Sequence, residues 1–389
     1  MPISSSNGRA LPYIDALFTA ASATCVTGLV TVGTAASWSV FGQIVILLLI
    51  QIGGLGIITF MTAVMLLFNR KIGISDRLLI QDAFNLNTLS GIVTFVKKVL
   101  AGTLTVEGIG ACFYMLVFVP QFGAKGIWIS IFNSVSAFCN AGFDIIGDGN
   151  SMLSYRHDPL VLCTLAVLVA IGGLGFIVWE DIIAKKSWKR LNVYSKVIIF
   201  AQIFFIVAGA FVYFILEYGN INTIGAESVG QKILASFFQS VTTRTAGFNT
   251  ADLGAMNDSS KAIMILMMLI GGSPGSTAGG MKTTTIAVLI LNAFATFGRE
   301  PETEVFGRRF DNTVVKNAAT IAMMYFILFF AGGMTISVYE GLPLSSCLFE
   351  AASAVGTVGL TLGITPKLHI LSQIILIILM YLGRVGGLT

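Results

Sequence analysis

Long apolar runs alternate with shorter, partly polar segments along this chain. Seven runs are long enough to cross the hydrocarbon core of a bilayer as an α-helix, which needs about 20 residues. These runs are Val40–Phe68, Phe95–Val119, Leu160–Ile183, Val193–Leu216, Ala262–Phe297, Val314–Val338 and Leu368–Gly386. The pattern therefore predicts seven membrane-spanning helices.

Four shorter segments rich in Phe, Ala, Ser and Thr lie between these runs. Each has about 14 residues, too few to cross a bilayer and typical of a half-helix that enters the membrane and turns back. The segments are Leu11–Thr24, Gly126–Cys139, Val229–Thr243 and Leu342–Val355. Each unit then comprises a span, a half-helix, a glycine-bearing loop and a second span, and the first unit lacks its leading span.

One short block recurs in all four units, ending in Gly28, Gly142, Gly247 and Gly359. A Phe lies ten residues before each glycine, and three copies carry Ser six residues before it, with Val241 as the exception. A second glycine signature follows each block, starting at Gly53, Gly172, Gly271 and Gly383. Recurrence at a fixed period is typical of a repeat architecture.

The repeats predict an all-α polytopic membrane protein with four tandem span–re-entrant loop–span units around a central pore. The predicted units are residues 1–70 (repeat A), 92–186 (repeat B), 193–298 (repeat C, with a broken span) and 313–389 (repeat D). Four units around one axis would bring the four glycine-bearing loops together, which is the geometry of a pore.

Composition agrees with this class. The 389 residues are 55% hydrophobic and 11% charged, whereas soluble domains carry about 25% charged residues. The lipid bilayer is therefore an expected partner. The net charge of +4 and the lack of a basic stretch interleaved with aromatics indicate no nucleic acid partner. Met1–Pro12 is polar, which predicts no cleavable signal peptide, and the five cysteines lack a C-x-x-C pair, which favours free thiols.

The basic residues predict the orientation. Of the 23 Lys and Arg residues, 14 lie in the stretches that join one unit to the next, and six flank the glycine loops on the other side. Cytoplasmic loops carry the excess of Lys and Arg. We therefore expect a multi-pass protein of the cytoplasmic membrane, with its joins inside and its glycine loops entering from outside.

The glycine loops are candidates for an ion-selectivity filter. Irregular backbone at membrane depth must be buried in protein or line a watery cavity. Glycine adopts positive φ without steric cost, so neighbouring carbonyls can face one axis and replace the hydration shell of a monovalent cation. The predicted ion-binding residues are Val26, Thr27, Gly28, Asn140, Ala141, Gly142, Thr245, Ala246, Gly247, Thr357, Val358 and Gly359. A turn glycine in an extracellular loop is the alternative for one copy, but four matched copies disfavour it.

These blocks resemble those of the Trk/Ktr/HKT superfamily of K⁺ transporters, closest to the bacterial Ktr membrane subunit. The matching stretches are Ala21-Ser-Ala-Thr-Cys-Val-Thr-Gly28, Ser136-Ala-Phe-Cys-Asn-Ala-Gly142-Phe143, Thr243-Arg-Thr-Ala-Gly247-Phe-Asn249 and Ala354-Val-Gly-Thr-Val-Gly359-Leu360. The resemblance implies K⁺-selective uptake through a gated, channel-like pore, with K⁺ held by backbone carbonyls. In this family Ser at the first filter position goes with Na⁺ preference, so Gly28 implies K⁺.

The resemblance also implies the surroundings of the pore. It implies a homodimer that sits on a cytosolic nucleotide-binding regulatory ring of the RCK type. It implies K⁺ as the transported ion and no organic cofactor, and Na⁺ activation from a separate site is left open.

The third unit has a second feature of its own, the run Gly271, Gly272, Ser273, Pro274, Gly275, Ser276, Thr277, Ala278, Gly279 and Gly280. Five glycines with a proline cannot continue a helix. A kink packed against neighbouring helices is one interpretation. The resemblance favours another, an intramembrane gating loop below the filter, with Lys282 beside it. Arg384 at the inner end of the last span would hold this loop, repel cations or extend to the interface.

Three other polar positions have structural interpretations. Glu107 lies mid-span, where packing with Ser or Thr of a neighbouring helix is favoured over ion binding. Arg244 is expected to brace the outer loop by bonding backbone carbonyls. His157 and His369 are isolated, which disfavours metal binding and catalysis.

Competing functions remain at this stage. A K⁺/Na⁺ or K⁺/H⁺ symporter is the main alternative, although intramembrane carboxylates are sparse and Glu107 is the one clear example. A membrane-embedded enzyme would need paired Asp, Ser-Lys or His clusters at membrane depth, which the sequence lacks, so no enzyme is predicted. A non-transporting scaffold would not need four filter-like loops.

Overall fold

Helices account for most of the chain in the computed structural model, which describes residues 2–68, 72–84, 91–147, 151–299, 304–305, 308–309 and 311–386. Three long helices head the second, third and fourth units, namely α6 (Ile92–Phe122), α10 (Val193–Glu217) and α14 (Asn312–Glu340). Each is long and apolar enough to cross a membrane, at the place of a predicted span. Residues 1, 70 and 389, at the ends of predicted repeats A and D, lie outside the described residues, as does Lys71 in the first join.

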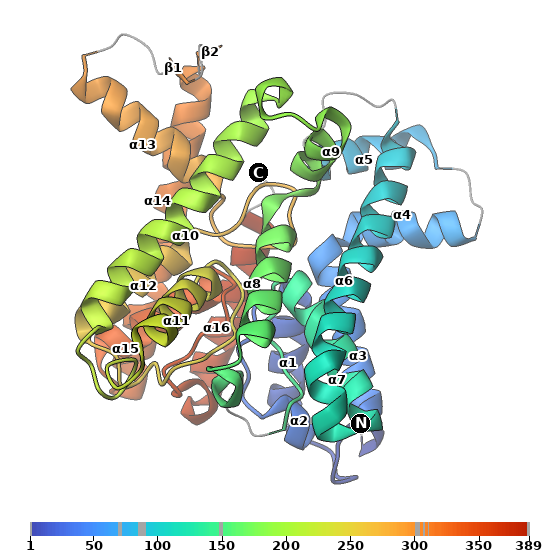
Figure 1. Ribbon diagram of the computed structural model, residues 1–389, viewed down its shortest axis with the longest axis vertical. Helices are drawn as coiled ribbons and strands as arrows, with labels where there is room; N and C mark the ends of the chain where they lie inside the picture. The colour runs from blue at the N-terminus through green and yellow to red at the C-terminus, as the bar shows by residue number, and fades with distance from the viewer. Residues whose placement is uncertain are drawn as a thin grey trace.

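Four short helices precede the glycine loops, and Figure 1 shows them in the lower half of the view. They are α1 (Tyr13–Cys25), α7 (Ala124–Phe138), α11 (Val229–Thr242) and α15 (Leu344–Val355). The last three pack against the long helix of their own unit, and α1 packs against α3. The start of α11 is fixed by a capping box, in which Ser228 and Gln231 satisfy each other's backbone N–H groups.

Two predicted spans are not continuous helices. The run Val40–Phe68 divides into α3 (Val40–Leu55) and α4 (Ile57–Leu67), bent by 106°. The run Leu160–Ile183 divides into α8 (Pro159–Leu174) and α9 (Phe176–Lys185), bent by 95°. The breaks fall at Gly56 and Gly175, with φ of 84° and 96°. A right-handed helix needs φ near −63°, so the last glycine of each Gly-Gly-Leu-Gly signature ends the helix.

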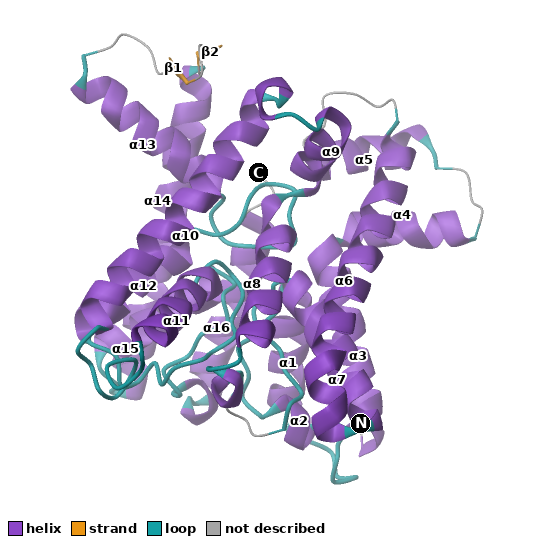
Figure 2. Ribbon diagram, viewed as in Figure 1, coloured by secondary structure: helices purple, strands orange, loops and turns teal. Residues whose placement is uncertain are grey.

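The third trailing run is broken as predicted, and the fourth is one helix. The third consists of α12 (Asp258–Leu269), the irregular segment that contains Gly271–Gly280, and α13 (Thr283–Phe297), and the fourth is α16 (Ile370–Val385). Figure 2 shows the irregular segments gathered between the helices. The remaining described elements are η1 (Pro2–Ser4), α2 (Thr34–Ser37), α5 (Ile74–Phe84), η2 (Leu153–Tyr155), η3 (Trp188–Arg190), η4 (Thr365–Lys367) and a strand pair, β1 (Glu304–Val305) with β2 (Arg308–Arg309).

The apolar residues of the long helices divide between the interior and the outer surface. On α10, Ile198 and Phe205 are buried, while Phe200, Val207 and Phe211 are 62–65% exposed. A helix that is apolar on both faces is typical of a membrane span, since lipid covers the outer face. The helices therefore enclose a central region where the loops meet, and that region holds the candidate site.

Candidate functional site

The four glycine loops share one unusual backbone conformation. Each glycine has positive φ, with 92° at Gly28, 68° at Gly142, 77° at Gly247 and 94° at Gly359. The residue two positions earlier is also left-handed, although it is not glycine, and these residues are Val26, Asn140, Thr245 and Thr357. Left-handed non-glycine residues are uncommon. Their recurrence at one register position of all four loops indicates a backbone shape that each unit maintains.

The loops contact one another in a closed ring. A Cβ atom built on Gly28 would lie 2.6 Å from the carbonyl oxygen of Ala141, and one built on Gly142 would lie 2.9 Å from that of Ala246. A Cβ on Gly247 would overlap the carbonyl oxygen of Val358, and a Cβ on Gly359 would overlap that of Thr27. Each loop thus touches the next and the fourth touches the first. The structure brings all twelve predicted filter residues together, and all twelve are buried.

The recurring Ser of the block supports the loop. Ser22 Oγ accepts a hydrogen bond of 3.0 Å from the Gly28 N–H, and Ser353 Oγ accepts one of 3.0 Å from the Gly359 N–H. Ser136 Oγ accepts from Phe143 N–H, also at 3.0 Å. The third unit has Val241 at this position, and Thr242 Oγ1 instead donates to the Phe248 carbonyl at 2.6 Å. The constant spacing made this Ser recognisable in the sequence. Only the structure shows that its hydroxyl bonds a backbone N–H of the filter loop.

In the first, second and fourth units, the second glycine signature packs against the end of the half-helix. A Cβ on Gly53, Gly172 or Gly383 would overlap a backbone carbonyl oxygen four residues before the filter glycine of the same unit. The carbonyls belong to Thr24, Phe138 and Val355. Glycine allows this close approach of two backbones. In the sequence, the similar spacing between the filter glycine and the second glycine signature in each unit is the feature that indicates this contact.

The segment Gly271–Gly280 crosses from the third unit to the second, where Figure 1 shows it beside α8. Ser273 N–H donates to the Gly173 carbonyl at 3.0 Å, and Thr277 N–H donates to the Gly172 carbonyl at 3.2 Å. Thr277 Oγ1 donates to the carbonyl of Phe138, at the end of α7, at 3.0 Å. Thr277, a predicted gate residue, therefore lies against the point where the half-helix α7 meets its filter loop.

Arg384 contacts both this segment and the first unit. Its Nη1 donates to the Thr277 carbonyl at 2.5 Å, and its Nη2 donates to the carbonyls of Gly53 and Gly54. Lys282 is only 9% exposed, and its Nζ donates to the Ala278 carbonyl at 2.8 Å. The guanidinium of Arg384 therefore bonds backbone carbonyls inside the protein. Its side chain does not extend to the membrane–water interface, which was one of the three expectations.

Arg244 occupies a different place from the one that we expected. Its Nη2 donates to the Gly271 carbonyl at 3.1 Å and lies 3.0 Å from Thr283 Oγ1. The expectation that Arg244 donates to a backbone carbonyl is confirmed. That carbonyl, however, belongs to Gly271, the first residue of the segment Gly271–Gly280. Arg244 thus connects filter loop C to the segment Gly271–Gly280, and its assignment as an outer-loop brace is wrong.

Three glutamates are buried among the described helices, namely Glu107, Glu217 and Glu350, and sequence reasoning singled out only Glu107. Its Oε2 accepts a hydrogen bond of 3.2 Å from Gln51, and Ser134 Oγ donates to its backbone carbonyl at 2.6 Å. Glu217 accepts from Asn220 and Thr223, each at 2.7 Å. Glu350, on α15, accepts from Thr361 and Thr365, each at 2.6 Å. Glu217 and Glu350 follow apolar runs and belong to no recognisable motif. Only the folded structure therefore shows that their side chains are buried.

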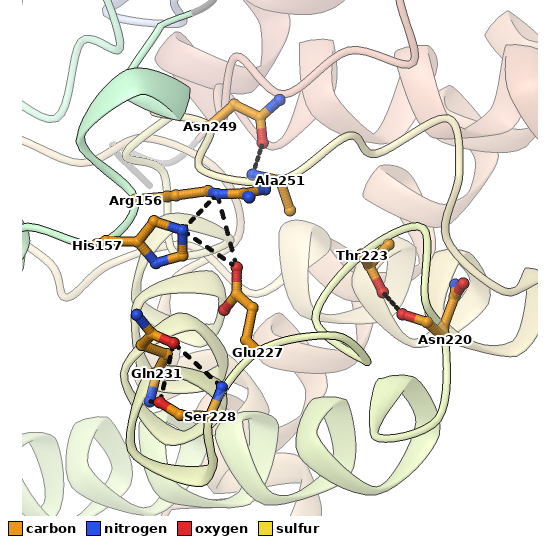
Figure 3. Close-up of polar contacts among 9 residues, drawn as sticks. All are labelled: Arg156, His157, Asn220, Thr223, Glu227, Ser228, Gln231, Asn249 and Ala251. Carbon is orange, nitrogen blue, oxygen red and sulfur yellow. Dashed lines mark hydrogen bonds and ion pairs between the residues drawn. The ribbon is translucent and has the colours of Figure 1, made fainter.

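The segment between α7 and α8 in the second unit is joined to the third unit, as Figure 3 shows in part. Arg156 and His157 lie 3.6 Å and 3.8 Å from Glu227 Oε1. The Met152 N–H also donates to the carbonyl of Asn249, two residues after the filter glycine, at 3.0 Å. The backbone contact holds the segment that follows the filter glycine Gly247 of the third unit. No group of three or more potential metal ligands occurs among the described residues.

A cavity of about 1010 Å³ adjoins the segment Gly271–Gly280. Its wall includes residues of α3 and α4, the segment itself, α13, α14 and α16. Six of the predicted gate residues line it, namely Pro274, Gly275, Ser276, Ala278, Lys282 and Arg384. The filter ring, the segment and the cavity are therefore adjacent.

Comparison with known protein families identifies the family to which this chain belongs. Residues 3–389 match the TrkH family model, described as cation transport protein. The chain belongs to the TrkH family. Membership makes it a membrane transport protein, in agreement with its apolar helices, and accords with the resemblance in the filter blocks.

Individual relatives of this TrkH-family chain match along its whole length. It is 39% identical to the potassium/sodium uptake protein NtpJ of Enterococcus hirae and 38% identical to the Ktr system potassium uptake protein B of Bacillus subtilis strain 168. Each alignment covers 100% of this chain and 87% of the relative. The crystal structure of the potassium transporter TrkH from Vibrio parahaemolyticus aligns with a TM-score of 0.77 at 20% identity, covering 97% of this chain and 77% of that one. That likeness concerns the fold.

Proposed function

We propose that this chain takes up K⁺ across the cytoplasmic membrane through the ring of four glycine loops. The ring is the observation that carries the proposal, because each loop reaches the next through a glycine whose Cβ would meet a carbonyl oxygen. Two relatives at 38–39% identity, one named a potassium uptake protein and the other a potassium/sodium uptake protein, support K⁺ as a transported ion.

Backbone chemistry explains how such a ring would select K⁺. Positive φ at alternate residues of each loop would let successive carbonyls face the same side, and carbonyl oxygens can replace the hydration shell of the ion. The half-helices end at the ring, so their partly negative C-terminal ends favour a cation there. The hydroxyls of Thr27 and Thr357 are buried without a hydrogen-bond partner among the described residues, which suits an ion as their partner.

The gate of this pathway is proposed to be the segment Gly271–Gly280 with Lys282 and Arg384. The segment is held by backbone hydrogen bonds to Gly172 and Gly173 and by the contact between Thr277 and Arg384. Each such bond contributes about 0.5–1.5 kcal/mol. A rearrangement that exchanges a few of them therefore lies within the few kcal/mol that govern conformational equilibria.

A coupled symporter is the second candidate, because one relative is named a potassium/sodium uptake protein. Na⁺ would then be a co-substrate or an activator. Proton coupling has less support, since Glu107, Glu217 and Glu350 each have hydrogen-bond partners within the helices. Simultaneous ²²Na⁺ and ⁸⁶Rb⁺ uptake distinguishes these options, because coupling requires a fixed ratio of the two fluxes.

The assembly is proposed to be a homodimer on a cytosolic nucleotide-binding ring, with the filter loops on the outer side. The basic run Lys185–Arg190 begins at the last residue of α9 and is largely exposed. We expect Lys186→Glu with Lys189→Glu to weaken co-purification with the ring by about tenfold, while the membrane part elutes unchanged on gel filtration. Unchanged ring binding would argue against this contact.

Uptake of ⁸⁶Rb⁺ by cells that lack their own K⁺ systems tests the proposed function directly. Expression of the chain with its regulatory partner should give saturable uptake that excess K⁺ inhibits and equal Na⁺ does not. A Gly33→Ser variant should behave like the parent, because Gly33 has φ of −60° and a Cβ there meets nothing closer than 3.9 Å. Expression in the membrane without such uptake would contradict the proposal.

A further inference from the structure

A small cavity lies beside the filter loop of the third unit. Its volume is about 10 Å³, and its wall includes Ala170 of α8, Gln202 of α10, Val241 of α11 and Arg244 of the loop. It shares no lining residue with the large cavity beside the segment Gly271–Gly280, and its described lining contains none of the twelve predicted filter residues. The small cavity is therefore separate from the proposed ion pathway.

Two polar side chains in this wall have an atom without a partner. Gln202 Nε2 donates to the Ala170 carbonyl at 3.0 Å, while Gln202 Oε1 is buried and has no hydrogen-bond partner among the described residues. The same is true of Arg244 Nη1. Leaving a buried polar group unsatisfied is costly. The cavity thus brings together one unsatisfied acceptor and one unsatisfied donor.

The guanidinium of Arg244 is held from its other side. Its Nη2 donates to the Gly271 carbonyl at 3.1 Å and lies 3.0 Å from Thr283 Oγ1. Its Cζ lies 5.5 Å from the centre of the Phe205 ring, on the same helix as Gln202. Because these contacts hold the group, Nη1 cannot turn to another acceptor without breaking them.

One water molecule satisfies both atoms. A cavity of about 10–15 Å³ is large enough for one water, which needs polar partners to stay there. Water can accept from Arg244 Nη1 and donate to Gln202 Oε1 at the same time. A cation would be repelled by the guanidinium, and an anion would face the amide oxygen.

The repeats show that this arrangement belongs to the third unit. Three residues before the filter glycine, where this unit has Arg244, the other units have Cys25, Cys139 and Gly356. The same unit also carries Val241 in place of the recurring Ser, and Val241 lines the cavity. The third loop therefore lacks the serine hydroxyl that supports the others and has an arginine of its own.

We propose that one buried water joins Arg244 to Gln202. Gln202 is then a positioning residue, because the water fixes the guanidinium that ties the filter loop of the third unit to Gly271. This inference goes beyond the proposed K⁺ uptake, and it can be tested whether or not the chain transports K⁺.

A density map of the purified full chain that resolves ordered water tests the site directly. We expect a peak within hydrogen-bond distance, about 2.7–3.2 Å, of both Arg244 Nη1 and Gln202 Oε1. The peak should be lost in Gln202→Leu. A direct contact between the two atoms, or a map that resolves other buried waters without this one, would overturn the proposal.

Thermal unfolding of the full chain tests the positioning role. Gln202→Leu leaves Arg244 Nη1 without its water-bridged acceptor, so it should lower the melting temperature by about 2 °C or more. In an Arg244→Met background the same change should cost less than half as much, because the donor is already gone. Equal losses in both backgrounds would count against the bridge.

Gln202→Glu is the conservative variant. Like Gln202→Leu it loses the hydrogen bond to Ala170, but it keeps an oxygen acceptor. It should therefore melt above Gln202→Leu beside Arg244, and not above it in the Arg244→Met background. If Gln202→Glu melts no higher than Gln202→Leu beside Arg244, the oxygen has no such role and the proposal fails.

Gln373→Leu is the matched control, on α16 of the fourth unit. Gln373 Nε2 donates to the Leu368 carbonyl at 3.0 Å, and its Oε1 is also buried without a partner among the described residues. Gln373 is not in the lining of the small cavity. Its replacement should lower the melting temperature equally with and without Arg244, and a dependence on Arg244 as large as that of Gln202→Leu would contradict a specific bridge.

Discussion

Replacing Gly359 by Ser is expected to remove most of the K⁺/Na⁺ discrimination of the transporter. Gly359 has φ of 94°, and a Cβ there would overlap the carbonyl oxygen of Thr27 in the first loop. The left-handed conformation alone costs about 1–2 kcal/mol for a residue with a Cβ. Because that carbonyl must move, we expect discrimination to fall by about tenfold or more, measured as inhibition of ⁸⁶Rb⁺ uptake by Na⁺.

The same change at Gly28, Gly142 or Gly247 should act in the same direction, since each Cβ would meet the carbonyl of the following loop. Gly33→Ser, in the segment between α1 and α2, is the matched control. Surface expression and gel-filtration profiles must match the parent before selectivity is compared. Unchanged selectivity in all four filter variants would remove the basis for the filter assignment.

Deleting Gly275–Gly279 is expected to raise K⁺ flux and to make it independent of the regulatory partner. The deletion removes Thr277, whose backbone and hydroxyl join the segment to Gly172, Phe138 and Arg384. If these contacts hold a closed state with about 0.1–10% open, the flux should rise about tenfold or more. Flux into liposomes, with and without the partner, measures both effects.

Arg384→Ala should also raise the flux, because its guanidinium joins Thr277 to the Gly53 and Gly54 carbonyls. Lys367→Ala removes an exposed cation between α15 and α16 and should leave the flux unchanged. A folded deletion variant that stays as slow as the parent and still responds to the partner would exclude this segment as the gate.

Local sequence predicted the helices well, because membrane helices are determined largely by the length of apolar runs. α6, α10 and α14 lie where long runs occur, and the four half-helices lie where short Phe- and Ser-bearing segments occur. The failures were the two bends. Gly56 and Gly175 sit inside runs that are apolar throughout, so hydropathy could not reveal a change of direction that depends on one left-handed glycine each.

The sequence by itself determined the class of the protein, its helices and the glycines that recur at one register in every unit. The spacing of residues within one unit is a local property, so it can be read directly from the sequence. Only the tertiary structure decided which carbonyl each glycine faces, that Arg384 reaches both Thr277 and Gly53, and that Arg244 braces the intramembrane segment. These contacts join residues as far apart as the first and fourth units. Packing of separate helices therefore decides them, and no local pattern encodes that packing.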